Sequence, residues 1–391
     1  MNMNKKLLLL CAIVICLGLI CIIPQPSPSK ADNYHQSKQF YTLTINNNQL
    51  DLSNKNLTAF DLEKIIIDTS IVNFSTNTLW PTKMPIGFDP KALLSSGMNP
   101  GLNIRNLHDL GIKGGGVGIG IIDQALLLTH NEFSDQIKYY ETTNSRYSDS
   151  EADYHGTVVA SIAVGNNDGV APEANLYYIN DALFNHGYTY DEIACSLSND
   201  ISKLIEINKD LSDSEKIRVI SISLSLRTVK ENCLDKQNLE LLDAAITKAE
   251  AADIVVLTTD IFDEYGDFGT PIKKLPYTDA DDYQNYFPSR TFYNRSIVEK
   301  ISVPIEGKTV AYYQGDNEYQ YVNNGGLSWA VPYIAGLYVL CCEVDPFMNY
   351  EKFIDVIEMT SLSLSSSYDN QLFRLDKIIQ PEQVILYLLS H

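Results

Sequence analysis

The feature that most constrains this chain is a regular alternation of short apolar segments with segments that are expected to be helical. The apolar segments are residues 117–123, 175–179, 218–224 and 253–259, and the segments with helical spacing are residues 158–164, 190–208 and 239–251. Near-continuous apolar strands that alternate with helices are typical of a parallel sheet covered on both faces. The pattern predicts an α/β domain of three layers, with a mainly parallel central sheet flanked by helices. In such sheets the functional site lies at the carboxyl ends of the strands.

Three polar residues stand at the ends of these predicted elements. Asp123 ends the first apolar strand, and His155 opens a run of small residues that suits a closely packed helix. Ser328 follows two glycines and precedes an apolar run with Pro332, which a helix tolerates only in its first turn. Each residue alone has an ordinary explanation as a cap or turn residue. Together they supply a nucleophile, a general base and a carboxylate that orients the base.

Five segments around these residues carry short motifs: 114–123, 155–160, 169–174, 220–225 and 326–332. The first ends in Ile-Ile-Asp, the second reads His-Gly-Thr-Val-Val-Ala and the third reads Gly-Val-Ala-Pro-Glu-Ala. The fourth ends in Ser-Leu-Ser, and the fifth reads Gly-Leu-Ser-Trp-Ala-Val-Pro. They resemble segments of the subtilisin-like serine proteases (subtilases), in which Asp, His and Ser occur in the same order. The resemblance runs from about residue 100 to residue 345 and implies a subtilisin-like fold.

The resemblance also implies a serine endopeptidase that works through an acyl-enzyme. Ser328 would attack the scissile carbonyl, His155 would take its proton, and Asp123 would hold the imidazole in the correct tautomer. The backbone N–H of Ser328 would be one donor of the oxyanion hole. Residues Ser223, Leu224 and Ser225 would bind an extended substrate by pairing with it as an added strand.

One position departs from the family. Where subtilases have an Asn side chain as the second oxyanion donor, this chain has Asp260, and an ionised Asp cannot donate a hydrogen bond. Losing such a donor lowers the rate by a factor on the order of 10²–10³. Either Asp260 is protonated, or Thr259 or another donor replaces it, or catalysis is slow. The alternative function is therefore a weakly active or inactive homologue that binds extended peptides, and the aromatic-rich segment 283–293 supports it.

The N-terminal residues have the pattern of a targeting segment. Two lysines precede an apolar core at 7–23, and a stretch rich in Pro and Ser ends at Ala31. We expect residues 1–31 to be a signal peptide and the protein to be secreted. An apolar core of 17 residues also reaches the lower limit of a spanning helix. Attachment to a membrane through residues 7–23, with an external catalytic domain, is therefore the alternative.

Composition separates the rest of the chain into two expected regions. Residues 32–78 are mostly polar and are expected to form an N-terminal extension, with a prosegment as one reading. Residues 79–391 are expected to be the peptidase domain. The net charge of −20 argues against nucleic acid as a partner and leaves a polypeptide substrate.

No metal site is predicted, because the chain lacks a CxxC pair and a His-rich cluster. The acidic run at 279–282 lacks the full ligand spacing of a calcium loop and fits a solvated loop better. No cofactor is expected, and a structural calcium ion at this run is the alternative.

Overall fold

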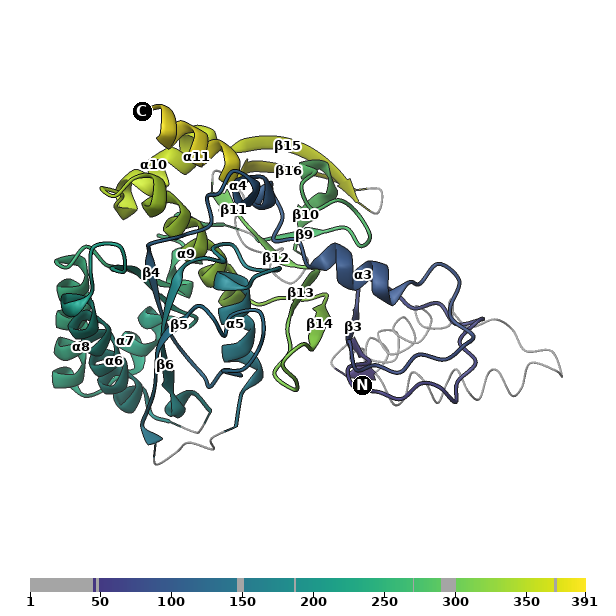
Figure 1. Ribbon diagram of the computed structural model, residues 1–391, viewed down its shortest axis with the longest axis horizontal. Helices are drawn as coiled ribbons and strands as arrows, with labels where there is room; N and C mark the ends of the chain where they lie inside the picture. Colours follow the sequence, from purple (N-terminus) through teal and green to yellow (C-terminus); the bar gives the residue numbers. More distant parts are fainter. Residues whose placement is uncertain are drawn as a thin grey trace, which may run out of the picture. The chain divides into compact units, whose positions relative to one another are not determined.

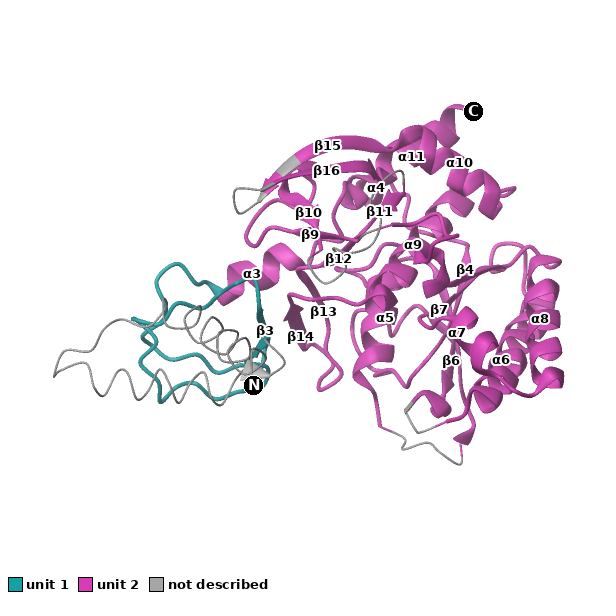
Figure 2. Cartoon of the chain, turned by 180° about the vertical axis from the view of Figure 1, so that it is seen from behind, with its two compact units in different colours: residues 1–89 teal, residues 90–391 magenta. Residues whose placement is uncertain are grey.

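A computed structural model describes residues 45–46, 49–145, 151–185, 188–269, 271–289, 300–368 and 371–391. The chain divides into two compact units, Met1–Asp89 and Pro90–His391 (Figure 2). The expected signal peptide, residues 1–31, lies outside the described residues. The expected boundary near residue 79 and the assignment of residues 32–78 as a prosegment stay predictions.

The first unit is a small layer built around regularly spaced leucines. Its strands are β1 (Ile45–Asn46), β2 (Gln49–Asp51) and β3 (Val72–Ser75); β1 pairs antiparallel with β2, and β2 pairs parallel with β3. Leu52, Leu57 and Leu62, spaced five residues apart, are all buried. The ring of Phe74 packs edge-on against Trp80, with 5.5 Å between ring centroids. The unit thus closes its apolar face with an aromatic contact.

The second unit is organised on a five-stranded parallel sheet. In spatial order the strands are β5 (Ile137–Thr143), β6 (Asn175–Asp181), β4 (Gly118–Asp123), β7 (Ile217–Ile222) and β8 (Val255–Thr258). Every neighbouring pair is parallel. The α/β class with a mainly parallel central sheet, predicted from the apolar alternation, is confirmed.

Helices cover both faces of this sheet (Figure 1). One face carries α6 (Tyr190–Asp210), α7 (Leu226–Asn232) and α8 (Lys236–Glu250). The other carries α5 (Tyr154–Val164) and α9 (Leu327–Val344). Two separate apolar cores result, one on each side of the sheet. The three-layer arrangement was predicted, but α5 begins four residues before the expected start at residue 158.

The remaining elements of the second unit surround this centre. The helices are α3 (Pro90–Gly97), α4 (Ile104–Asp109), α10 (Tyr350–Thr360) and α11 (Pro381–Ser390). The strands are β9 (Ile272–Lys274), β10 (Tyr286–Pro288), β11 (Ile301–Ser302), β12 (Pro304–Glu306), β13 (Lys308–Ala311), β14 (Tyr319–Val322), β15 (Leu362–Tyr368) and β16 (Gln371–Ile378). The short 3-10 turns are η2 (Ala182–Asn185), η3 (Thr259–Phe262) and η4 (Tyr283–Asn285). The described part of the segment 260–295 contains two of these strands and two of these turns.

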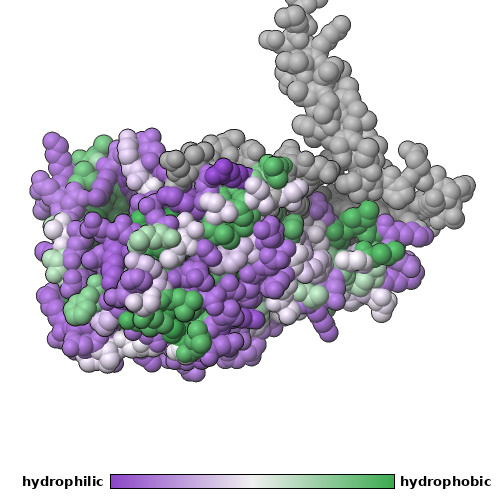
Figure 3. All heavy atoms as spheres, turned by 90° about the horizontal axis from the view of Figure 1, so that it is seen from above, coloured by the Kyte–Doolittle hydropathy of each residue, from purple (hydrophilic) through white to green (hydrophobic). Residues whose placement is uncertain are grey.

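One helix and one face of the molecule can be compared with the expected membrane attachment. Among the described helices, α9 is long and apolar enough to cross a membrane, but most of its residues are buried in the protein core. The face drawn in Figure 3 is mainly hydrophilic, with smaller hydrophobic groups between. The burial of α9 is that of a core helix of the second unit.

Candidate active site

Asp123 and His155 meet where the central strand ends. Asp123 is the last residue of β4, and His155 lies in the first turn of α5. The Nδ1 atom of His155 is 2.6 Å from Oδ1 of Asp123. Because an ionised carboxylate only accepts, Nδ1 carries the proton and donates it, which leaves Nε2 as the acceptor. The carboxylate is 3% exposed and the imidazole 31%, so the orienting group is buried while the ring reaches the surface.

The start of α5 is fastened to the same strand end. Asp153 is the N-cap of α5, and its Oδ1 accepts the backbone N–H of His155 at 3.0 Å. A Cβ on Gly156 would clash with the backbone carbonyl oxygen of Gln124, the residue that follows β4, so only glycine allows this close approach. The first turn of α5 is therefore held in a fixed position against β4.

The charges around His155 decide its proton affinity. Burial lowers the pKa of His155, but the charge of Asp123, the hydrogen bond to Asp123 and the charge of Asp153 together raise it above its ordinary value. The imidazolium is therefore stabilised at this position, as expected for a base that becomes charged during a reaction.

Ser328 occupies the positive end of a buried helix. It is the second residue of α9, so its backbone N–H has no carbonyl partner within the helix. Its carbonyl oxygen accepts the hydroxyl of Ser223 at 2.9 Å. This bond connects the start of α9 to the segment that follows β7.

The predicted substrate-binding segment is partly occupied by internal hydrogen bonds. The N–H of Leu224 donates to the Ile222 carbonyl at 2.8 Å, and its carbonyl accepts the N–H of Thr259 at 3.1 Å. Ser225 is the N-cap of α7, and its carbonyl accepts the N–H of Val229 at 3.2 Å. These bonds occupy both backbone groups of Leu224, so an added strand here would pair with its neighbours Ser223 and Ser225.

The carboxylate of Asp260 accepts hydrogen bonds at the start of α7 and does not act as an oxyanion donor. Its carboxylate accepts the hydroxyl of Ser225 at 2.5 Å, the backbone N–H of Arg227 at 2.9 Å and the hydroxyl of Thr258 at 3.1 Å. It lines a hollow of about 500 Å³ together with residues of α7 and α8. These contacts make Asp260 an acceptor that caps α7, with no hydrogen left to donate.

The acidic run at 279–282 is used for local structure. The carboxylate of Asp281 accepts the backbone N–H of Asn103 and the side-chain amide of Asn99, both at 2.8 Å. Asp282 is the N-cap of η4. Among the residues that the structure describes, no group of three or more His, Cys, Asp and Glu side chains could hold a metal ion.

One residue and one contact of this site were not identified from the sequence. The residue is Asp153, although an Asp just before a small-residue helix is a typical N-cap signal. The bond from Ser223 to the Ser328 carbonyl joins residues 105 positions apart, and no local pattern indicates it.

Comparison with known protein families gives a match to part of the chain. The model of the subtilase family (peptidase S8) matches residues 114–259. This part of the chain is therefore similar to the subtilase family. The matched residues include Asp123, His155 and all five strands of the central sheet, whereas Ser328 lies beyond them.

The solved structures that are similar to this chain share little sequence identity with it. The PatG macrocyclase domain is 14% identical with a TM-score of 0.47, and covers 74% of this chain and 95% of its own. The PatG macrocyclase in complex with peptide is 13% identical with a TM-score of 0.49, covering 73% and 95%. The prenylagaramide maturation protease PagA is 14% identical with a TM-score of 0.46, covering 74% and 99%. The comparison with curated protein sequences gives no match.

Proposed function

We propose that the protein is a serine endopeptidase that hydrolyses peptide bonds through Asp123, His155 and Ser328. The observation that carries this proposal is the 2.6 Å hydrogen bond between Asp123 and Nδ1 of His155, inside the segment that matches the subtilase family. The bond leaves Nε2 free to accept a proton, which is the role of a general base. The position of Ser328 at the start of α9 supplies a hydroxyl next to an unpaired backbone N–H.

In the proposed reaction the Ser328 hydroxyl attacks the peptide carbonyl and forms a C–O bond. Its proton passes to Nε2 of His155, and the carbonyl electron pair moves onto oxygen, where the Ser328 N–H stabilises it. When the intermediate collapses, the C–N bond breaks and His155 gives the proton to the leaving amine. Water then repeats the sequence on the acyl-enzyme and releases the acid.

The proposal includes export from the cell. Residues 1–31 have the lysines, apolar core and small residues of a cleaved signal peptide, and this composition supports secretion. Attachment through residues 7–23 is the alternative. Sequencing the N-terminus of the protein recovered from culture medium and from membranes separates the two: a start near residue 32 supports cleavage, and an intact N-terminus in the membrane fraction contradicts it.

A weakly active homologue that binds extended peptides is the second candidate function. It is favoured by Asp260, whose carboxylate accepts three hydrogen bonds and offers no donor to an oxyanion. Hydrolysis of casein or of a fluorogenic peptide distinguishes the two candidates, because a peptide-binding homologue binds the substrate with little or no turnover.

A fluorophosphonate probe tests the proposed nucleophile directly. The wild-type protein is expected to be labelled, and Ser328→Ala to lose the label while it retains its thermal stability. Ser214→Ala, at an exposed serine outside the site, is the matched control and is expected to label as the wild type does. Labelling that survives Ser328→Ala would overturn the proposal.

A further inference from the structure

Asp123, Ser223 and Thr259 occupy one row across three neighbouring strands. Ile122 of β4 lies opposite Ile222 of β7, and Ile222 lies opposite Thr258 of β8. The residue that follows each of these is Asp123, Ser223 or Thr259. All three therefore stand at the carboxyl ends of adjacent parallel strands, with neighbouring chains roughly 4.8 Å apart.

The same row faces the helices that carry His155 and Ser328. Side chains alternate between the two faces of a strand. Ile121, Val219 and Leu257 belong to the apolar core that also contains α5 and α9. Ile122, Ile220 and Ile222 belong to the opposite core, with α6 and α8, and Val256 packs against that core. Asp123 and Thr259 lie two residues beyond Ile121 and Leu257, and Ser223 lies four residues beyond Val219, so all three have the parity of the first set.

Two hydrogen bonds establish this orientation independently. Asp123 bonds to His155 of α5, and the hydroxyl of Ser223 bonds to the carbonyl of Ser328 in α9. Thr258 has extended backbone angles, φ −135° and ψ 174°, so the alternation of side chains continues into Thr259. Thr259 is thus the third member of the row and faces the side where Ser328 lies.

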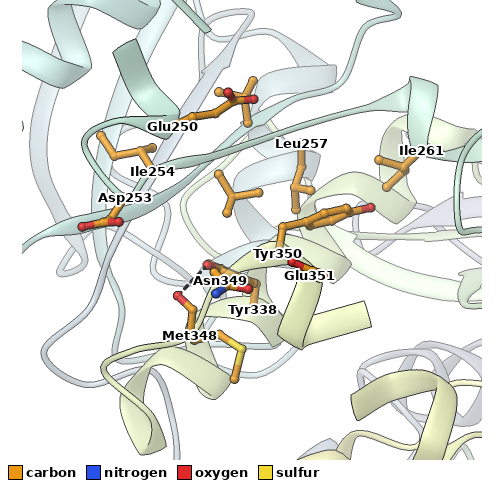
Figure 4. A pocket seen from close by; sticks show the side chains of 12 residues that line it. Glu250, Asp253, Ile254, Leu257, Ile261, Tyr338, Met348, Asn349, Tyr350 and Glu351 are labelled. Carbon is orange, nitrogen blue, oxygen red and sulfur yellow. Dashed lines mark hydrogen bonds between the residues drawn. The ribbon is translucent and has the colours of Figure 1, made fainter. Parts of the chain in front are cut away.

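Figure 4 shows a cavity beside β8 and η3. Leu257 and Ile261, on either side of Thr259 in the sequence, line a cavity of about 700 Å³ together with Tyr338 of α9. Thr258 and Asp260 line the hollow on the opposite side, with Arg227 and Lys230 of α7. Val256 lines both hollows, but the residues of the turn are separated, with Leu257 and Ile261 lining one and Thr258 and Asp260 the other.

Thr259 differs from its neighbours in the hydrogen bonds of its side chain. The hydroxyl of Thr258 is used by Asp260, because it donates to the carboxylate at 3.1 Å and accepts the Asp260 N–H at 3.2 Å. The backbone N–H of Thr259 bonds to the Leu224 carbonyl at 3.1 Å, which ties the residue to the segment after β7. The Thr259 hydroxyl has no partner among the described residues and remains available to a ligand.

We propose that the hydroxyl of Thr259 is the second oxyanion donor, in the place that Asp260 cannot fill. This inference rests on the proposed function, because an oxyanion forms only if Ser328 attacks a carbonyl. When that C–O bond forms, the carbonyl electron pair moves onto oxygen. The oxygen then accepts one hydrogen bond from the Ser328 N–H and one from the Thr259 hydroxyl. No proton is transferred from Thr259.

The test compares two substitutions at Thr259 in the full chain, with fluorogenic peptides that differ in the residue before the scissile bond. Thr259→Val keeps the shape of the side chain and removes the donor. We expect kcat to fall on the order of 10²–10³-fold with KM within about threefold, by the same factor for every peptide. Thr259→Ser keeps a hydroxyl, and its kcat is expected within about tenfold of wild type. Thr258→Val, on the opposite face, is the matched control and is expected to lower thermal stability with kcat unchanged.

Different results separate this inference from the proposed function. If wild type labels with fluorophosphonate at Ser328 and Thr259→Val turns over at the wild-type rate, the inference is wrong and the function stands. A loss of activity confined to certain peptides would also overturn it, because the hydroxyl would then contact a side chain of the substrate. An increase in kcat of two orders of magnitude in Asp260→Asn would also overturn it, because it would show that the side chain of residue 260 occupies the position of the second oxyanion donor. If wild type neither labels nor hydrolyses peptides, both the function and the inference are wrong.

Discussion

The carboxylate of Asp123 accepts a hydrogen bond of 2.6 Å from Nδ1 of His155. The two residues come from different layers, because Asp123 ends the central strand β4 and His155 begins the covering helix α5. The bond sets the tautomer of the imidazole and leaves Nε2 as the proton acceptor. Most of the chemistry proposed for this protein depends on this one contact.

Replacing Asp123 by Asn is expected to lower kcat by about 10⁴-fold. The amide keeps the size of the carboxylate but presents an N–H to Nδ1 and so favours the wrong tautomer. Steady-state hydrolysis of a fluorogenic peptide measures the effect, and circular dichroism checks that the fold is retained. A folded variant with activity close to wild type would show that the contact has no catalytic part.

The charge of Asp153 is expected to affect the pH dependence of activity. His155 must be neutral to act as a base, so kcat/KM rises with pH through its pKa. Asp153 helps to raise that pKa, and Asp153→Asn should therefore move the rising limb to lower pH. The Asn side chain still caps the helix, which keeps α5 in place. Glu151→Gln is the charge-matched control, and an equal shift in both variants would contradict a specific role of Asp153.

Gly336 is expected to tolerate no larger residue. A Cβ at this position would lie 2.7 Å from Cβ of Val170 and 3.1 Å from the carbonyl oxygen of Ala163, the next-to-last residue of α5. Gly336→Ala should therefore push α9 away from α5 at a cost of about 1–3 kcal/mol of unfolding free energy. Urea unfolding measures this cost. Gly115→Ala, where a Cβ meets nothing closer than 3.6 Å, is the control and should unfold like wild type.

The buried carboxyl group of Asp200 is expected to make stability depend on pH. Burial, followed by the charge of Asp181, raises the pKa of Asp200 to about 8, so the folded protein holds a proton that the unfolded chain loses near pH 4. Since the folded state binds more protons in this window, its stability falls as pH rises from about 4 to 8. Asp200→Asn imitates the protonated form and should lose less stability over this range. Thermal unfolding at pH 5 and pH 8.5 tests this, and equal losses in the two proteins would contradict it.

The cap formed by Asp260 is expected to stabilise the protein. Asp260→Ala removes the acceptor for Ser225, Arg227 and Thr258 and should cost about 1–2 kcal/mol of unfolding free energy. Asp260→Asn should also be less stable than wild type, and its kcat should not increase. Denaturant unfolding and peptide hydrolysis of the same preparations report both quantities. An unchanged free energy of unfolding in Asp260→Ala would show that the cap does not stabilise the protein.

Local patterns predicted the centre of the domain well. The strand expected at 117–123 is β4 at Gly118–Asp123, and the helix expected at 190–208 is α6 at Tyr190–Asp210. Both have strong local signals: an uninterrupted apolar run in one case, and a capping box with amphipathic spacing in the other. The segment 260–295 was predicted less well, because β9 has three residues and pairs with β12, more than 25 positions away. Such a short strand has no periodicity to detect.

The sequence by itself determined the chemistry available to this protein: the order of Asp123, His155 and Ser328, and the apolar alternation that builds a parallel sheet. The tertiary structure decided which of several neighbouring residues faces the site. Thr258, Thr259 and Asp260 are adjacent in the chain, and nothing in their order says which of them faces Ser328. That is decided by the register of β8 on β7, because the pairing of Ile222 with Thr258 sets which side chains point toward α9. A strand shifted by one residue would reverse the assignment.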